Sequence, residues 1–240
     1  MKRLVALAAV LLVAGCGSGG DSPHLTVFAA TSLKSAFERY EPGTRYSFAG
    51  SDELAAQIRQ GSTPDVYAAA NVRLPMQLYA KKLVDLPVVF ASNRLVLAVP
   101  AGSSKVRSLN DLAKPGVNLA IGSASVPIGS YTRQVLARLG AARSKAVLKN
   151  VKSEEPDVGG IVGKLTQGAV DAGLVYVTDV EAARGRLTAI ALPARLQPVV
   201  RYGVAIARGT KHRGEARAFV EGLLKGSGRQ QLLKAGFGAP

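Results

Sequence analysis

Hydrophobic and polar positions after residue 24 form two kinds of segment in alternation. Short apolar runs rich in β-branched residues are typical of buried strands, whereas apolar residues three or four positions apart, preceded by Ser, Asp or Pro, are typical of helices. Strands are predicted at 25–30, 45–49, 65–69, 93–99, 118–121, 145–150, 172–177, 187–191 and 199–207. One helix is predicted directly after Ser32, which would be its N-cap. Further helices are predicted at 50–60, 74–81, 108–113, 127–139, 157–166, 215–224 and 228–235. The alternation predicts an α/β architecture with mainly parallel sheets.

The start of the chain has a different pattern. Two basic residues at 2–3 precede an apolar stretch at 4–14, which is shorter than the roughly twenty residues of a membrane-spanning helix. The stretch ends in Leu-Val-Ala-Gly-Cys at 12–16, which resembles the lipobox of bacterial lipoproteins, where the Cys becomes the acylated N-terminus.

Cys16 is the only Cys of the chain. Its position in the lipobox predicts a lipoprotein signal peptide at 1–16, lipidation of Cys16 and a flexible tether at 17–23. The alternative is an ordinary secretory signal in which the Cys is incidental.

Composition limits the classes of function. The chain of 240 residues is 48% hydrophobic and 20% charged, as in a globular protein. Its net charge of +15 favours anions, but the Lys and Arg residues are scattered and match no nucleic-acid module. One Cys and two His residues, His24 and His212, exclude an intrachain disulfide and a Cys/His metal site.

Four predicted strand-to-helix junctions are rich in Ser, Gly and Pro. They lie at 30–32, 49–51, 126–129 and 156–159. The first turn of a helix presents unpaired N–H groups and a partial positive charge, which favour anions, and ligands of α/β proteins gather at the carboxyl ends of strands. Junctions that face one crevice would bind an oxyanion through neutral donors. The alternative at each junction is simple N-capping.

The residues at these junctions resemble the motifs of the molybdate-binding proteins (ModA). The chain reads LTVFAATSL at 25–33, SFAGSDELA at 47–55, VPIGSY at 126–131 and DAGLVYVTD at 171–179. These segments are similar to the V-F-A-A-x-S-L, F-A-x-S-x-x-L-A, V-P-x-G and G-x-V-Y-x-S/T-D motifs of that family, in the same order. The resemblance extends from residue 25 to Phe237 and covers nearly the whole mature chain.

The resemblance implies a two-lobed, periplasmic-binding-protein-like fold (type II) of the α/β class. Each lobe would be a mostly parallel sheet flanked by helices, and the ligand would lie in the cleft between them. Residues 24–93 and 200–240 would form lobe I, and residues 94–199 would form lobe II. The chain crossings near 93–95 and 200–202 would act as a hinge.

The resemblance also implies which residues bind the oxyanion. Lobe I would provide the hydroxyls of Ser32 and Ser51. Lobe II would provide the backbone N–H groups of Ile128 and Val158 and the hydroxyl of Tyr176. No catalytic residue, no cofactor and no direct protein-to-metal bond is expected, because the molybdenum would be bound as its oxyanion.

The function implied by the resemblance is that of the extracytoplasmic solute-binding component of an ABC importer. It would be exported and lipid-anchored at the cell membrane, on the outer face of the cytoplasmic membrane or in a periplasm. As a monomer, it would bind molybdate and tungstate and deliver them to the permease and ATPase complex.

The chemistry of the donors fits molybdate. Near neutral pH this dianion carries no proton and only accepts hydrogen bonds, whereas hydrogen phosphate also needs an acceptor. Asp52 and Asp157 lie beside two of the implied ligands, and we expect their side chains to point away and stabilise helix N-termini. A carboxylate facing the ion would instead allow phosphate as a ligand.

Three alternatives stay open from the sequence. The first is a receptor of the same fold for sulfate, phosphate or an organic anion. The second is a hydrolase, although His24 and His212 are poorly placed to serve as a base and no G-x-S-x-G or Ser-x-x-Lys motif occurs. The third is a purely structural surface lipoprotein, which would bind no oxyanion. We predict that the protein is not an enzyme.

Overall fold

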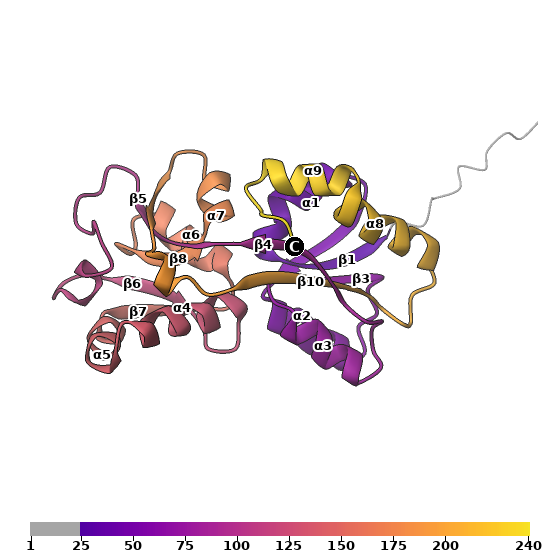
Figure 1. Cartoon of the computed structure of the whole chain (residues 1–240), viewed down its shortest axis with the longest axis horizontal. Helices are drawn as coiled ribbons and strands as arrows, with labels where there is room; N and C mark the ends of the chain where they lie inside the picture. The colour runs from indigo at the N-terminus through magenta and orange to yellow at the C-terminus, as the bar shows by residue number, and fades with distance from the viewer. Residues whose placement is uncertain (1–24) are drawn as a thin grey trace, which may run out of the picture.

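The computed structural model describes residues 25–240, which form two groups of strands and helices lying side by side (Figure 1). The predicted signal peptide, Cys16 and the tether lie outside the described residues. Within residues 25–240, no helix is both long enough and apolar enough to cross a membrane.

A five-stranded sheet forms the centre of the first group. Its order is β2 (Arg45–Ala49), β1 (Thr26–Ala30), β3 (Val66–Ala69), β10 (Val200–Ile206) and β4 (Val88–Asn93). One face is covered by α1 (Lys34–Tyr40), α8 (Arg213–Lys225) and α9 (Ser227–Lys234), and the other by α2 (Ser51–Arg59) and α3 (Arg73–Ala80) (Figure 1). Apolar side chains are buried on both faces, because both are covered. We call this group the first lobe.

Two smaller sheets form the second group, the second lobe. The order of one is β8 (Gly173–Tyr176), β5 (Leu95–Pro100) and β9 (Leu187–Ala191), and the other pairs β6 (Leu119–Gly122) with β7 (Val151–Glu155). The helices of this lobe are α4 (Pro127–Arg138), α5 (Ala141–Lys149), α6 (Val158–Thr166) and α7 (Val177–Ala182). Short 3-10 turns occur at η1 (Thr31–Leu33), η2 (Asp111–Ala113) and η3 (Ala194–Leu196).

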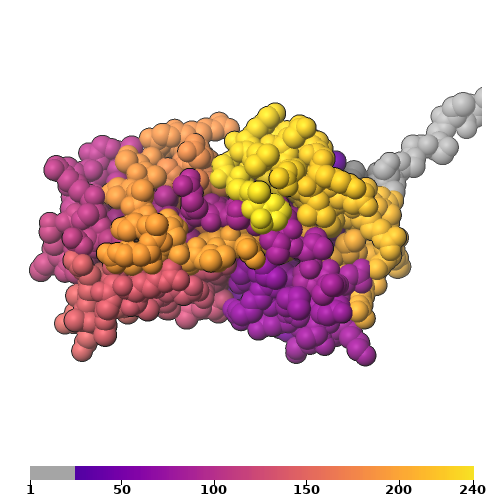
Figure 2. Space-filling view, viewed as in Figure 1, coloured from indigo at the N-terminus to yellow at the C-terminus, as the bar shows by residue number. Residues whose placement is uncertain are grey.

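The chain passes between the lobes twice. Only Arg94 separates β4 of the first lobe from β5 of the second, and the chain returns through η3 into β10. In the space-filling view, the C-terminal segment lies against residues of the N-terminal half (Figure 2). The first lobe therefore combines segments that are far apart in the sequence, which anchors both crossing strands in one sheet.

The predicted α/β class is confirmed, but the sheets are mixed. The pairs of β1 with β2 and β3 are parallel as predicted. The pair of β6 with β7 is also parallel, although β7 itself was not predicted. The strands β10 and β5 instead run antiparallel to their neighbours. Both enter their sheets directly from the other lobe, and a helical crossover is the connection that normally makes neighbouring strands parallel.

One predicted strand is wrong. Residues 145–150 belong largely to α5, and the strand that follows is β7. The apolar pair at 147–148 resembled the centre of a strand, but only Val147 is buried. The Ala, Arg, Lys and Leu residues around it have high helix propensity. The predictions also omitted β4 and α7.

Candidate functional site

A small cavity between the two lobes is lined by all the predicted ligand residues. Ser32 and Ser51 follow strands β1 and β2 of the first lobe, and Ile128, Val158 and Tyr176 belong to the second lobe. The remaining lining residues are Ala30, Thr31, Ala49, Gly50, Ala70, Val126, Pro127 and Asp157. The cavity volume is about 10 Å³, roughly the space of one water molecule, so the two lobes are close together here. We call it the inner cavity.

The two serine hydroxyls are held by polar neighbours of the first lobe. Ser51 Oγ accepts a hydrogen bond from the N–H of Ala70 at 3.1 Å, and Ser32 Oγ lies 2.9 Å from the hydroxyl oxygen of Tyr202. The bond from Ala70 uses a lone pair of Ser51 and leaves the hydroxyl proton free to donate. Ser32 keeps its own proton free when Tyr202 is the donor.

The prediction that Ser32 caps a helix is wrong. Ser32 lies inside η1, which continues directly into α1, and the N-cap of α1 is Leu33, without a side-chain cap. The N-cap of α2 is Gly50, again without a side-chain cap. Capping therefore does not explain the hydroxyls of Ser32 and Ser51 at this cavity.

The starts of two helices of the second lobe bring backbone donors to the inner cavity. Ile128 is the second residue of α4 and Val158 is the first residue of α6. N–H groups in the first turn have no partner within their helix, and the helix dipole makes this end partly positive. Both N–H groups are thus suited to a negatively charged ligand.

The two neighbouring carboxylates differ in position. Asp157 Oδ1 accepts a hydrogen bond from the N–H of Gly160 at 3.1 Å, so it caps α6 as expected, although the residue also lines the inner cavity. Asp52 is not among the lining residues, and its Oδ1 is buried without a hydrogen-bond partner among residues 25–240.

Tyr176 carries the clearest sign of a missing partner. The residue is 1% exposed, and within the described part of the chain its hydroxyl has no hydrogen-bond partner. Buried polar groups nearly always have one. Burial raises the pKa of Tyr176 well above its ordinary value, so the hydroxyl keeps its proton and remains a donor.

Sequence reasoning missed Thr31. Its Oγ1 is also buried without a hydrogen-bond partner in the described chain, and the residue lines the inner cavity. The available signal was its place beside Ser32 at the same strand-to-helix junction. Thr31 adds a third hydroxyl from the first lobe, after those of Ser32 and Ser51.

A further residue positions Tyr176. Asp179 Oδ2 accepts a hydrogen bond from the N–H of Tyr176 at 2.9 Å. Burial raises the pKa of Asp179, the bond from Tyr176 lowers it, and the charge of Asp157 raises it, which places it at about 7. Asp179 therefore titrates near neutral pH, next to the inner cavity.

This titration predicts a pH dependence of anion binding. A dianion in the inner cavity disfavours ionised Asp179, so binding raises its pKa further and takes up a proton. The affinity for the anion should fall as the pH rises through about 7. Above this pH the Asp179 carboxyl is ionised in the free protein, so tight binding requires that it take up a proton. Asp179→Asn keeps an oxygen acceptor for the Tyr176 N–H and should flatten the profile. Calorimetry in buffers of different ionisation enthalpy measures the proton uptake, and an equal uptake by the variant would refute the assignment.

The rest of the site offers little for catalysis or direct metal binding. Among the described residues, no His lines the inner cavity, so neither serine has an imidazole base beside it. His212 instead has its Nδ1 3.2 Å from Asp65 Oδ1. Residues 25–240 contain no group of three or more His, Cys, Asp or Glu side chains that could hold a metal ion.

The chain is similar to bacterial proteins that bind solutes outside the cell. The profile of the family described as "Bacterial extracellular solute-binding protein" matches residues 25–238. The molybdate-binding protein ModA of Mycobacterium tuberculosis is 36% identical, over 98% of this chain and 97% of that protein.

Two further proteins are similar to this chain, one in sequence and one in fold. A putative ABC transporter substrate-binding lipoprotein of Bacillus subtilis, YvgL, is 32% identical over 98% of this chain and 96% of that protein. The periplasmic molybdate-binding protein of Azotobacter vinelandii has the same fold, with a TM-score of 0.81, 21% identity and coverage of 90% of this chain and 100% of that one. The chain belongs to the bacterial extracellular solute-binding proteins and, within them, to the ModA family of molybdate-binding proteins.

Proposed function

We propose that the protein is the extracytoplasmic receptor of an ABC importer for molybdate, and that it also accepts tungstate. The observation that carries this proposal is the buried Tyr176 hydroxyl at a cavity lined by Ser32 and Ser51, which keeps its proton and has no hydrogen-bond partner among residues 25–240. The N–H groups of Ile128 and Val158 complete the set of neutral donors. Two similar proteins that are named molybdate-binding protein ModA support molybdate as the ligand.

The donor set explains why a fully deprotonated dianion is preferred. Hydroxyls and N–H groups donate to its oxygens and bring no buried counter-ion with its desolvation cost. Among residues 25–240, Asp157 is the one acidic residue that lines the inner cavity, and its Oδ1 accepts a hydrogen bond from the N–H of Gly160. A hydrogen phosphate would need a free acceptor here.

We further propose that the ion is bound by closure of the lobes. In this proposal the first lobe (lobe I) comprises residues 24–93 and 200–240, and the second lobe (lobe II) comprises residues 94–199. The chain crossings at Arg94 and before β10 act as the hinge. The small volume of the inner cavity corresponds to a closed arrangement, which opens to admit an oxyanion. The permease of the importer receives the closed form.

The export proposal rests on the sequence. The segment at 12–16, which resembles a lipobox, supports a signal peptide at 1–16 and a lipid anchor on Cys16. The name of the Bacillus subtilis relative, a lipoprotein, agrees with this. Mass spectrometry of the protein from a bacterial membrane fraction should find diacylglyceryl on Cys16, and a free thiol there would refute the anchor.

Calorimetric titration with molybdate, tungstate, sulfate and phosphate tests the ligand. We expect tight one-to-one binding of molybdate and tungstate and no comparable binding of the other two. Binding of sulfate or phosphate instead would retain the receptor class and overturn the substrate. Absence of binding by all four anions would overturn the receptor function.

A further inference from the structure

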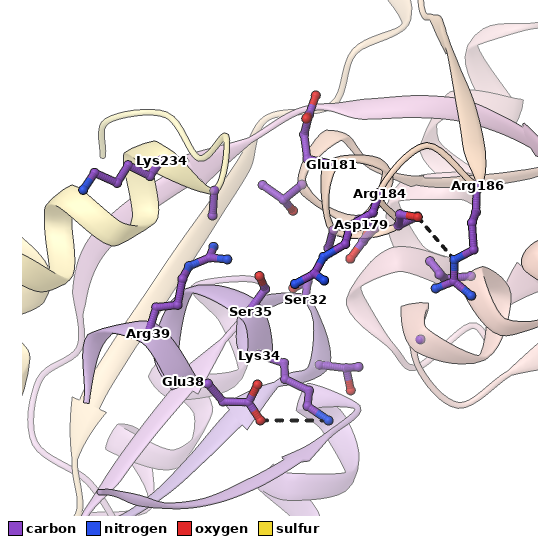
Figure 3. Close-up of a pocket in the computed structure, with 17 residues that line it drawn as sticks. Ser32, Lys34, Ser35, Glu38, Arg39, Asp179, Glu181, Arg184, Arg186 and Lys234 are labelled. Atoms are coloured by element: carbon purple, nitrogen blue, oxygen red, sulfur yellow. Dashed lines mark hydrogen bonds and ion pairs between the residues drawn. The ribbon is translucent and has the colours of Figure 1, made fainter. Parts of the chain in front are cut away.

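A second, larger cleft adjoins the inner cavity (Figure 3). Its volume is about 640 Å³, and α1 and α9 of the first lobe and α6 and α7 of the second contribute to its walls. Thr31 and Ser32 line both spaces, and Gly159, which lines this cleft, follows Val158 of the inner cavity. We call this space the outer cleft. It lies directly outside the proposed ligand site.

Basic side chains predominate around the outer cleft. Its basic lining residues are Lys34, Arg39, Arg184, Arg186 and Lys234, and its acidic ones are Glu38, Asp179 and Glu181. Lys34 is 4.0 Å from Glu38, and Arg186 Nε donates to the carbonyl of Ala183 at 3.2 Å.

Two arginines face this space from opposite lobes without a partner. Among residues 25–240, the guanidinium groups of Arg39 on α1 and Arg184 after α7 make no hydrogen bond or ion pair. Both residues are exposed, and both side chains extend into the space between the lobes (Figure 3). Their charges are therefore available to an approaching anion.

The backbone at Arg184 is unusual for an arginine. Its φ is 50°, in the left-handed region that favours Gly or Asn. The following residue, Gly185, has a φ of 80°, so the turn that ends α7 needs two left-handed residues. The backbone conformation at this position favours glycine, but the residue is Arg184. Its side chain brings a positive charge to the outer cleft.

The charges of Arg39 and Arg184 act on an approaching anion through their electrostatic potential. Potentials in a cleft lined by one sign of charge raise the local concentration of the opposite ion and its association rate, and this effect decreases as salt is added. The Debye length at physiological ionic strength is about 8 Å, so charges at the mouth of a site act on an ion before it makes contact.

We propose that Arg39 and Arg184 make the outer cleft the entrance for the anion, where the dianion is concentrated before the lobes close. The two guanidinium groups speed association and do not hold the ion in the inner cavity, whose lining residues include neither arginine. Because the arginines belong to different lobes, an anion between them also draws the lobes together. This inference rests on the proposed oxyanion-binding function.

Stopped-flow measurement of molybdate association tests the entrance. The chain has 7 Tyr and no Trp, and tyrosine fluorescence reports binding because Tyr176 lines the inner cavity. The double variant Arg39→Gln/Arg184→Gln is compared with Arg143→Gln/Arg217→Gln. The latter removes from each lobe one exposed arginine that lies outside the outer cleft and makes no hydrogen bond or ion pair among residues 25–240, so the change in net charge is the same.

The entrance variant should lower the association rate constant about tenfold at low ionic strength. It should also flatten the salt dependence of that rate constant and leave the dissociation rate unchanged. Equal association rates for the two double variants would overturn the proposal. A faster dissociation at an unchanged association rate would also overturn it, because the arginines would then hold the bound ion. Absence of molybdate binding by the unsubstituted protein would instead refute the proposed function.

Discussion

Replacement of both serines at the inner cavity, Ser32→Ala/Ser51→Ala, is expected to weaken molybdate binding by at least about a hundredfold. Each hydroxyl donates to a dianion, and a hydrogen bond to a charged group contributes about 1.5–3 kcal/mol, which is about ten- to a hundredfold in the dissociation constant. Calorimetry of the single and double variants measures the loss of molybdate affinity. Each single variant should show part of the loss that the double variant shows.

The two serines should differ in their effect on folding stability. Ser51→Ala also removes the acceptor for the buried N–H of Ala70, and an unsatisfied buried donor costs about 1–3 kcal/mol. Ser32→Ala leaves the hydroxyl of Tyr202 to find another partner. Thermal unfolding without ligand separates this cost from the loss of binding.

A matched control keeps the experiment specific. Ser130→Ala removes a hydroxyl from α4, two residues after Ile128 and outside the inner cavity, and should bind molybdate as the unsubstituted protein does. The ligand assignment fails if the double serine variant retains full affinity, or if Ser130→Ala loses as much affinity as it does.

Gly50→Ala is expected to weaken binding about five- to a hundredfold by obstructing closure of the lobes. A Cβ atom on Gly50 would lie 2.4 Å from the carbonyl oxygen of Pro156, which is backbone of the opposite lobe. The φ of −57° and ψ of 135° at Gly50 suit alanine, so the new methyl group leaves the local backbone unstrained. Overpacking of this kind costs about 1–3 kcal/mol, and the lobes avoid the clash by staying apart.

Neighbouring glycines provide a graded series. A Cβ on Gly159 would lie 2.8 Å from Thr31 Cγ2, the end of a side chain that can move, so Gly159→Ala should have a smaller effect. Gly163 lies in the same helix, α6, and a Cβ there would have nothing within 4 Å, so Gly163→Ala should bind normally.

The closure model predicts where the effect appears. Dissociation should become faster in Gly50→Ala, and small-angle scattering should show less compaction on addition of molybdate than in the unsubstituted protein. Equal affinity and equal compaction in the two proteins would exclude contact between Gly50 and Pro156 as part of the bound state.

The sequence predicted much of this arrangement for identifiable reasons. Buried strands such as β5 are uninterrupted apolar runs, and the Ser- and Gly-rich junctions lie at the ends of strands, so both are visible in the residues themselves. The ligand set came from the family resemblance, and the structure brings its members together at one cavity.

Other features depend on tertiary contacts that no local pattern reveals. The antiparallel pairing of β10 follows from its return from the second lobe, more than a hundred residues after β4. The pKa of Asp179 depends on its burial and on Asp157. The lack of a hydrogen-bond partner for the Thr31 hydroxyl among residues 25–240 depends on its neighbours in space. α5 was misassigned because a short apolar pair fits either a strand or a helix.

A crystal structure of the protein with molybdate is the most direct test of the central claim, because the anomalous signal of molybdenum places the ion without ambiguity. We expect the molybdenum in the inner cavity, with its oxygens about 2.5–3.2 Å from the donors. The donors are the hydroxyls of Ser32, Ser51 and Tyr176 and the N–H groups of Ile128 and Val158. A molybdenum peak in the outer cleft between Arg39 and Arg184, or no peak at saturating molybdate, would contradict this account.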